Sequence, residues 1–370
     1  MKIVFIGFDI EGLGGISTYS RYQVKALRDK FKKEVVVYSL ISLSKEYDGY
    51  VDHSIVYANK LSIIKLLVNL IMNIKDIDLI VFNHVNLSFL GAFLKKLFSV
   101  KYIVFGYNID LLRQFSYLQN IGLENCDRLV IDCNFTINNL NKFHSTIPPT
   151  DLLYDPVDTD FFHKLDNSLE ILKNKYNLFL DNNFILSTVA VMRKDEMYKG
   201  HFEILEAIKK LNNEKILYFV VGGGDGRSLV ESKVKELSLE NQVIFFGFVE
   251  NELIPHFYNA SDVVALISKN EYGKGEGVPL GLIEASACEV PILGGNEDGS
   301  YEAISDKYPN GFSVSPRNID EIAEKIQFYI DNPEMKKVHG QNGRKFVIEE
   351  FEYSKFRDKQ TAIINEVLNV

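Results

Sequence analysis

The chain has little cysteine and no long uninterrupted apolar run. Its three cysteines are an odd number and lack metal-site spacing, so we expect structural thiols in a reduced, cytosolic setting. The longest apolar stretch, Leu61 to Ile74, is interrupted by Lys65, Asn69 and Asn73. It is shorter than the ~20 residues that span a bilayer. Residues 1–7 are apolar but run straight into a glycine-rich turn, which favours a first strand over a signal peptide.

Positively charged residues are outnumbered by acidic ones, 41 against 50. The net charge of −9 over 370 residues argues against general nucleic-acid binding. Low-complexity tracts and repeats of solenoid period are absent. What remains is an ordinary globular composition, 46% hydrophobic and 25% charged, at a length that suggests two domains.

Short apolar runs alternate with helical patterns in two consecutive series. Such runs are typical of strands buried in parallel sheets, so the order predicts an α/β protein. We expect two doubly wound, Rossmann-like domains that face each other across a cleft. Prolines at 148, 149 and 156 mark the crossover, which gives domains 1–155 and 156–350. The predicted strands are Ile3–Ile6, Val35–Tyr38, Leu79–Phe82, Tyr102–Phe105 and Leu129–Ile131, then Ile185–Ala190, Leu217–Val221, Val243–Phe246, Val263–Ile267 and Pro291–Leu293.

Two carboxylates, Glu276 and Glu284, flank a Gly/Pro-containing turn that leads into a predicted helix. Free N–H groups at the mouth of such a helix favour anions, whereas carboxylates would repel phosphate and suit sugar hydroxyls. The spacing therefore predicts a nucleotide-sugar site, with Glu276 for a sugar and Glu284 for a ribose. The backbone expected to meet the diphosphate is that of Gly277, Val278, Pro279 and Leu280.

Glycines in two further turns are candidates for contact with the donor. Gly14 and Gly15 open a helix after the first strand, where backbone N–H groups favour a diphosphate. The loop lacks the third glycine of a dinucleotide fingerprint, and a simple tight turn explains it equally well. Gly223, in a second glycine turn, is expected beneath a base or phosphate, with a tight turn again as the alternative.

Arg193 and Lys199 follow the strand at 185–190. Cations at the carboxyl end of a strand suit a diphosphate leaving group, and the alternative is that they are solvated loop charges. We expect that second role for Lys194, Asp195 and Glu196.

His84 and residues 107–110 end successive strands of the first domain. Tyr107, Asn108 and Asp110 would then face the cleft from the acceptor side, together with His84. A buried structural role is the alternative for His84, and it is the role that we expect for His201. The spacing supports no Ser/His/Asp arrangement and no metal-ligand cluster.

These pieces, in this order, resemble the retaining GT-B glycosyltransferases of family 4, the glycosyl transferases group 1. The resemblance covers nearly the whole chain. Its matching pieces are the loop Gly14-Gly15-Ile16, the interdomain segment Tyr154–Phe161, Arg193 with Lys199-Gly200, the stretches Gly247–Val249 and Tyr258–Asp262, and Glu276 and Glu284 followed by Ala285 and Pro291.

The resemblance implies a catalytic set of Arg193, Lys199 and Glu276, with Glu284 on the ribose. It implies transfer from a UDP- or GDP-linked sugar with retention of configuration, and no metal or other cofactor, because Arg and Lys neutralise the departing diphosphate. The acceptor would be a glycan or lipid-linked molecule, as in bacterial surface polysaccharide biosynthesis. The amphipathic run 351–370 would pack back on the first domain.

Two departures from the family pattern leave alternatives open. Tyr107 stands where many relatives carry a His, and residues 270–275 are inserted before Glu276, so that Glu271 has the wrong spacing to Glu284. The Tyr107 departure supports a catalytically weakened subunit that scaffolds or regulates a partner transferase. A nicotinamide-dependent oxidoreductase is a third possibility, opposed by the incomplete fingerprint and by the lack of an acidic residue closing the strand at 35–40.

One region combines positive charge with leucine. The region contains six lysines and two aspartates, so its local charge is positive although the whole chain has a net charge of −9. Together with the apolar positions of 87–98, they predict peripheral contact with an anionic membrane at its inner, cytoplasmic face. The alternative is that the leucines are core and the lysines solvated. The residues are Lys60, Lys65, Lys75, Lys95, Lys96, Lys101, Leu87, Leu90, Leu94, Leu97 and Phe98.

Overall fold

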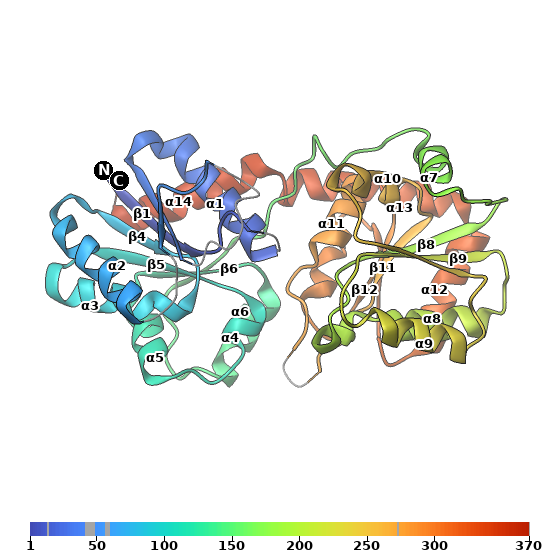
Figure 1. Ribbon diagram of the computed structural model, residues 1–370, viewed down its shortest axis with the longest axis horizontal. Coiled ribbons are helices and arrows are strands. Elements are labelled where there is room, and N and C mark those ends of the chain that lie inside the picture. Colours follow the sequence, from blue (N-terminus) through green and yellow to red (C-terminus); the bar gives the residue numbers. More distant parts are fainter. Residues whose placement is uncertain (13–14, 41–48, 56–59, 272–273, 370) are drawn as a thin grey trace. The chain divides into compact units, whose positions relative to one another are not determined.

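The computed structural model describes residues 1–369 except 13, 14, 41–48, 56–59, 272 and 273. The chain divides into two compact units (Figure 1). One comprises Met1–Pro156 together with Tyr353–Val370, and the other comprises Val157–Glu352.

The N-terminal unit contains a seven-stranded sheet of order β3-β2-β1-β4-β5-β6-β7, in which all described pairs are parallel. All five strands predicted for this part are present, and two short strands, β3 and β7, are additional. The strands are β1 (Ile3–Phe8), β2 (Val35–Leu40), β3 (His53–Ile55), β4 (Leu79–Phe82), β5 (Lys101–Gly106), β6 (Arg128–Ile131) and β7 (Thr150–Leu152).

Helices cover both faces of this sheet, because alternate strand residues point to opposite sides. On one face Val4 and Ile6 join a core cluster with helices α2, α3 and α5, and on the other Ile3 and Phe5 join a cluster with α1 and α14. The α14 helix packs on α1, where the Tyr353 hydroxyl donates to Asp29 at 2.7 Å. The helices are α1 (Gly15–Phe31), α2 (Lys60–Met72), α3 (Ser88–Phe98), α4 (Asn108–Leu111), α5 (Tyr117–Glu124), α6 (Asn134–Asn139) and α14 (Tyr353–Leu368).

The C-terminal unit contains a six-stranded parallel sheet of order β10-β9-β8-β11-β12-β13. The five strands predicted here are confirmed, and the edge strand β13 is additional. The strands are β8 (Phe184–Val189), β9 (Ile216–Val221), β10 (Val243–Gly247), β11 (Val263–Leu266), β12 (Ile292–Gly295) and β13 (Gly311–Val314). The helices are α7 (Ser168–Tyr176), α8 (His201–Leu211), α9 (Arg227–Glu236), α10 (Ile254–Asn259), α11 (Leu280–Ala287), α12 (Ile319–Asp331) and α13 (Pro333–Glu350).

The structure corrects one set of sequence predictions. Leu87, Leu90 and Leu94 are almost completely buried in the core beneath α3, so they cannot meet a membrane. The three cysteines are free and buried, as expected for structural thiols. Among the described residues, no helix combines the length and apolar character needed to cross a bilayer.

Candidate functional site

A glycine turn after β9 holds the segment that carries Arg193. The Met192 N–H donates to the Gly223 carbonyl, and the Gly226 N–H donates back to the Met192 carbonyl, each at 2.9 Å. Gly224 has a φ of +144°, and a Cβ there would lie 2.0 Å from the Met192 carbonyl oxygen, so only glycine fits. Gly223 therefore has a structural role beside Arg193, and its contact with a nucleotide stays a prediction.

The Lys199 amine lies among carboxylates at the end of the short turn that follows β8. Its Nζ is 2.9 Å from Glu196 Oε2 and 3.5 Å from Glu276 Oε1, and its side chain is only 14% exposed. Glu196 also accepts from the mostly exposed Arg193 at 3.2 Å. Burial alone would lower the pKa of Lys199, but Glu276 and Glu196 outweigh it and raise that pKa, so the amine stays charged.

Glu196 is not the solvated loop charge that the sequence predicted. It bridges Arg193 and Lys199 because all three lie in one short turn that ends at Gly200. Gly200 has a φ of +87°, and a Cβ there would lie 2.3 Å from the Ile267 carbonyl oxygen. The spacing of Glu196 from each cation, three positions, was the available signal.

Asp298 holds the first motif carboxylate in place. It is fully buried and accepts from the Glu276 N–H at 2.7 Å and from the Ser300 N–H at 3.0 Å. The Ser268 hydroxyl, just beyond β11, also donates to it. Burial raises the pKa of Glu276, Lys199 lowers it and Asp298 raises it again, with a net upward shift. Asp298 was not foreseen, because its role depends on three segments that only the fold brings together.

Glu284, the second motif carboxylate, lies on α11 and accepts from the Tyr258 hydroxyl at 2.7 Å. Burial raises the pKa of Glu284 to about 7, although the bond from Tyr258 lowers it in part. In its protonated and its ionised form alike, the Glu284 carboxyl group has an oxygen that can accept a hydrogen bond from a hydroxyl, as the ribose role requires.

The start of α11 offers backbone donors beside these carboxylates. Its N-cap is Pro279, with no side-chain cap bond. A Cβ on Gly281 would lie 3.2 Å from the Val189 carbonyl oxygen, so the helix begins against the end of β8. Orphan N–H groups in this position favour an anion. Gly277, Val278 and Leu280 can donate, but Pro279 has no N–H, so its predicted contact with phosphate cannot be a backbone hydrogen bond.

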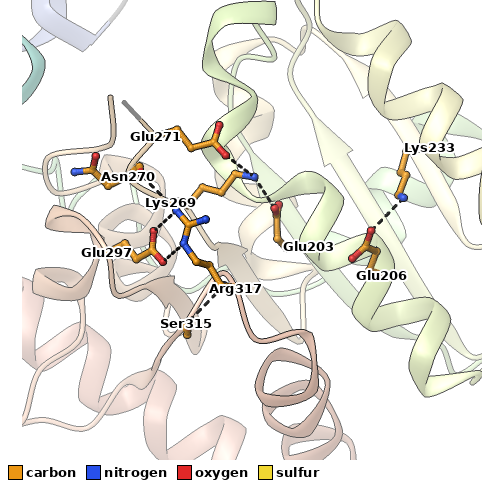
Figure 2. A network of polar contacts seen from close by, with 9 residues as sticks. All are labelled: Glu203, Glu206, Lys233, Lys269, Asn270, Glu271, Glu297, Ser315 and Arg317. Carbon is orange, nitrogen blue, oxygen red and sulfur yellow. Dashed lines mark hydrogen bonds and ion pairs between the residues drawn. The ribbon is translucent and has the colours of Figure 1, made fainter. Parts of the chain in front are cut away.

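A charged network anchors the segment that precedes Glu276 (Figure 2). Lys269 Nζ lies 2.8 Å from Glu203 on α8 and 3.0 Å from Glu271. Arg317 forks onto both oxygens of Glu297 and approaches the Asn270 carbonyl at 3.5 Å. Glu271 is therefore engaged with Lys269, and its exclusion as a motif carboxylate stays a prediction. Residues 272 and 273 of this segment lie outside the described residues.

In the N-terminal unit, His84 and Asp110 come together. His84 Nδ1 accepts from the Asn86 N–H at 3.1 Å, and its Nε2 lies 3.0 Å from Asp110 Oδ2. An accepting Nδ1 carries no proton, so the proton resides on Nε2 and is donated to the carboxylate. Both side chains are partly exposed, at 12% and 26%, and remain accessible to a ligand.

Tyr107 and Asn108 lie deeper in the same unit. Tyr107 packs edge-on against Tyr19 in the core cluster beneath α1, and its hydroxyl is 3.4 Å from Asn83 Nδ2. Asn108 is 5% exposed and accepts from the Thr136 hydroxyl at 3.2 Å. Their predicted contacts with sugar stay predictions. Of the glycine loop, Gly15 is the first residue of α1, and Gly14 lies outside the described residues.

His201 has the structural role that we expected. It is buried at the start of α8, and its Nδ1 is 2.9 Å from the Tyr218 hydroxyl. Burial, aided by the nearby Lys199, lowers the pKa of His201 to about 4, so the ring is neutral at physiological pH.

Comparisons with known proteins agree with this architecture. An uncharacterized glycosyltransferase of Methanocaldococcus jannaschii is 24% identical over 366 residues, covering 94% of this chain and 93% of its own. The capsular polysaccharide biosynthesis glycosyltransferase CapM of Staphylococcus aureus is 31% identical over 193 residues, 51% of this chain and 47% of its own. This chain thus matches less than half the length of CapM.

Among solved structures, HepE of Anabaena in complex with UDP has a TM-score of 0.81 at 16% identity, covering 99% of this chain and 100% of that one. Residues 170–346, within the C-terminal unit, match the family model described as glycosyl transferases group 1. That segment is thus similar to the glycosyl transferases group 1, and the chain as a whole has the GT-B fold.

Proposed function

We propose that the chain transfers a sugar from a UDP- or GDP-linked donor to a glycan or lipid-linked acceptor, with retention of anomeric configuration. The observation that carries this proposal is the position of the Lys199 amine, which lies 3.5 Å from Glu276. The segment that follows Glu276 leads into the start of α11, which has no side-chain cap. One locus thus offers a cation and backbone donors for phosphate, and carboxylates for sugar hydroxyls.

The chemistry that we propose is electrostatic. Charge develops on the diphosphate as the glycosidic bond breaks, and Lys199, Arg193 and the α11 N–H groups would stabilise it there. These cations would do the work that a metal ion does in other phosphate sites, so we expect turnover to survive chelation. Glu276 would hold the donor sugar by its hydroxyls, and Glu284 would hold the ribose. These roles rest on the resemblance together with the positions of the side chains.

The donor and acceptor are proposed to bind to different units. The C-terminal unit carries the donor set. In the N-terminal unit, the His84–Asp110 pair supports an acceptor role, because a ring held at Nε2 by a carboxylate and at Nδ1 by a backbone N–H is fixed in orientation. The name of CapM supports a surface polysaccharide as the product, and HepE, solved with UDP, puts UDP-sugars first among the donors to test.

A catalytically weakened subunit is the second candidate. The observation that favours it is the burial of Tyr107 at the place where the family pattern has a His. The two proposals differ in turnover: the weakened subunit would bind a nucleotide without transferring sugar, and would raise the activity of a partner transferase.

The test is a panel of UDP- and GDP-sugars, measured for protection against thermal unfolding and for hydrolysis or transfer with and without EDTA. Protection by one nucleotide class with EDTA-insensitive turnover supports the first proposal, and the anomeric proton of the product in NMR reports retention. Protection without turnover supports the second candidate. If no nucleotide protects the chain, both proposals fail.

A further inference from the structure

The α2 helix has an apolar face that points into solvent as well as one that is buried. Leu66 and Leu70 are buried in the core of the N-terminal unit. On the other side Leu61, Ile64, Val68 and Met72 are 61%, 53%, 50% and 80% exposed. Steps of three or four residues place these four in one row along the helix. Single exposed apolar side chains are ordinary, but a continuous row indicates a surface that another body covers.

The helix α3 carries exposed apolar side chains as well. Both helices pack on the same core cluster, which places them on one face of the sheet (Figure 1). Phe93, Leu97 and Phe98 of α3 are 44%, 56% and 43% exposed. We call these seven residues of α2 and α3 the outer apolar surface.

The charged residues of α2 and α3 themselves are all lysines. Neither α2 nor α3 contains an aspartate or glutamate, although the chain as a whole has a net charge of −9. Lys65 and Lys96 are exposed on these helices, and just beyond α2 the exposed Lys75 is followed by the exposed Asp76. The nearby Asp78 accepts from the Lys2 N–H at 2.7 Å and lies 4.0 Å from the N-terminal amine, so its charge is already opposed.

From this combination we propose that the outer apolar surface lies against an anionic lipid bilayer, with its apolar row at the boundary between headgroups and acyl chains. A row of apolar side chains beside lysines is the arrangement that binds in the plane of such an interface. Lysine stems can lie along the apolar layer while their amines reach the lipid phosphates. Each lysine near the surface strengthens binding about fivefold.

The structure thereby changes which residues are expected to touch lipid. The leucines at 87, 90 and 94 belong to the core, and the contact shifts to α2 and to the outer side of α3. Contact with a membrane would favour an acceptor that is presented there, and this is the one point at which the proposal rests on the proposed function. Lipid binding is measured without turnover. The membrane proposal can therefore fail while the donor proposal stands, and the donor proposal can fail while lipid binding is observed.

The chain has no tryptophan, so a single introduced tryptophan reports on its own surroundings. We would make Val68→Trp, and as a matched control Phe179→Trp, whose parent side chain is fully exposed in the C-terminal unit. Vesicles of equal parts phosphatidylglycerol and phosphatidylcholine should shift the emission of Val68→Trp to the blue and leave the control unchanged. High salt should reverse the shift. The absence of a shift on Val68→Trp, or an equal shift on both, would overturn the proposal.

Co-sedimentation of the full chain with the same vesicles provides the second measurement. Ile64→Glu with Val68→Glu should weaken binding by about tenfold or more, because it puts charge into the apolar layer. Phe179→Glu should bind like the wild type. Lys65→Glu with Lys96→Glu should remove the preference over pure phosphatidylcholine vesicles. The melting temperature of each variant is checked first, and should change little because the replaced side chains are at least half exposed or charged.

The main rival for this surface is a second copy of the chain. Light scattering without lipid distinguishes the two. A monomer supports the membrane proposal, whereas a dimer that dissociates in the variant with Ile64→Glu and Val68→Glu would overturn it and assign the surface to self-association.

Discussion

Glu284→Gln tests the electrostatics of the second motif carboxylate through its effect on stability. Burial raises the pKa of Glu284 from 4.5 to about 7. A carboxyl group whose pKa is higher in the folded chain holds its proton more tightly there. It therefore contributes stability that is fully present below about pH 4.5 and is lost as the pH rises through about 7.

The difference between 4.5 and about 7 corresponds to about 3 kcal/mol at the standard conversion for one pH unit. Above pH 7 the wild type must bury an ionised carboxylate, whereas an amide cannot ionise and can still accept from the Tyr258 hydroxyl. We expect Glu284→Gln to be more stable than the wild type at pH 8 by up to about 3 kcal/mol. For a unit of this size, that raises the melting temperature by roughly 6–12 °C.

Thermal unfolding of both proteins, followed by circular dichroism at pH 5 and pH 8, measures this effect. At pH 5 the carboxyl group of the wild type is mostly protonated, so the two melting temperatures should nearly coincide. Glu240→Gln, at an exposed glutamate of the same unit, is the control and should change little at either pH. An equal change at both pH values for Glu284→Gln would refute the reasoning, because it would show that the effect comes from packing and not from ionisation.

Other predictions concern the remaining site residues. Lys199→Ala should lower kcat/KM by roughly 10²–10³-fold, since it removes a charge from the developing diphosphate; steady-state kinetics on a folded variant showing near-wild-type turnover would mean that the donor site is misplaced. Asp298→Asn should raise the KM for the donor by roughly tenfold, because its amide nitrogen turns a donor toward the Glu276 or Ser300 N–H; an unchanged KM would separate Asp298 from donor binding. His84→Gln should raise the KM for the acceptor while donor hydrolysis stays as in the wild type, and a loss of donor hydrolysis would assign His84 to the donor instead.

The strands that sequence analysis found share one property. Leu79–Phe82 and Ile216–Val221 are buried along their whole length, so they appear as unbroken apolar runs. The strands that it missed lie at sheet edges and are short. His53–Ile55 and Thr150–Leu152 contain polar residues and are partly exposed, so no run distinguishes them from a loop. Their pairing is set by the sheet beside them.

The site was only partly predictable for a similar reason. Arg193, Lys199, Glu276 and Glu284 stand out by residue type and spacing, and the fold brings Lys199 to Glu276. The residues that fix them do not stand out. Asp298 and Tyr258 act across segments that meet only because β8, β11 and β12 are neighbours in the sheet. Spacing along the chain contains no information on such contacts.

Glu196 gives the clearest case of a residue whose role depends on its contacts. It accepts from both Arg193 and Lys199, at 3.2 Å and 2.9 Å, and these are the cations that the proposed function assigns to the diphosphate. The carboxylate and a diphosphate therefore compete for the same donors. Removing the charge by Glu196→Gln should tighten the binding of UDP or GDP by roughly fivefold, equivalent to about 1 kcal/mol.

Asp195→Asn is the matched control, because it removes the same charge one position away, where the side chain is 71% exposed and 4.0 Å from Lys274. Calorimetry of nucleotide binding at low salt should show tighter binding for Glu196→Gln alone. Equal tightening in both variants would mean that only the general field has changed. Weaker binding in Glu196→Gln would mean that the carboxylate orients the two cations for the diphosphate, and the competition that we infer from its two contacts would be wrong.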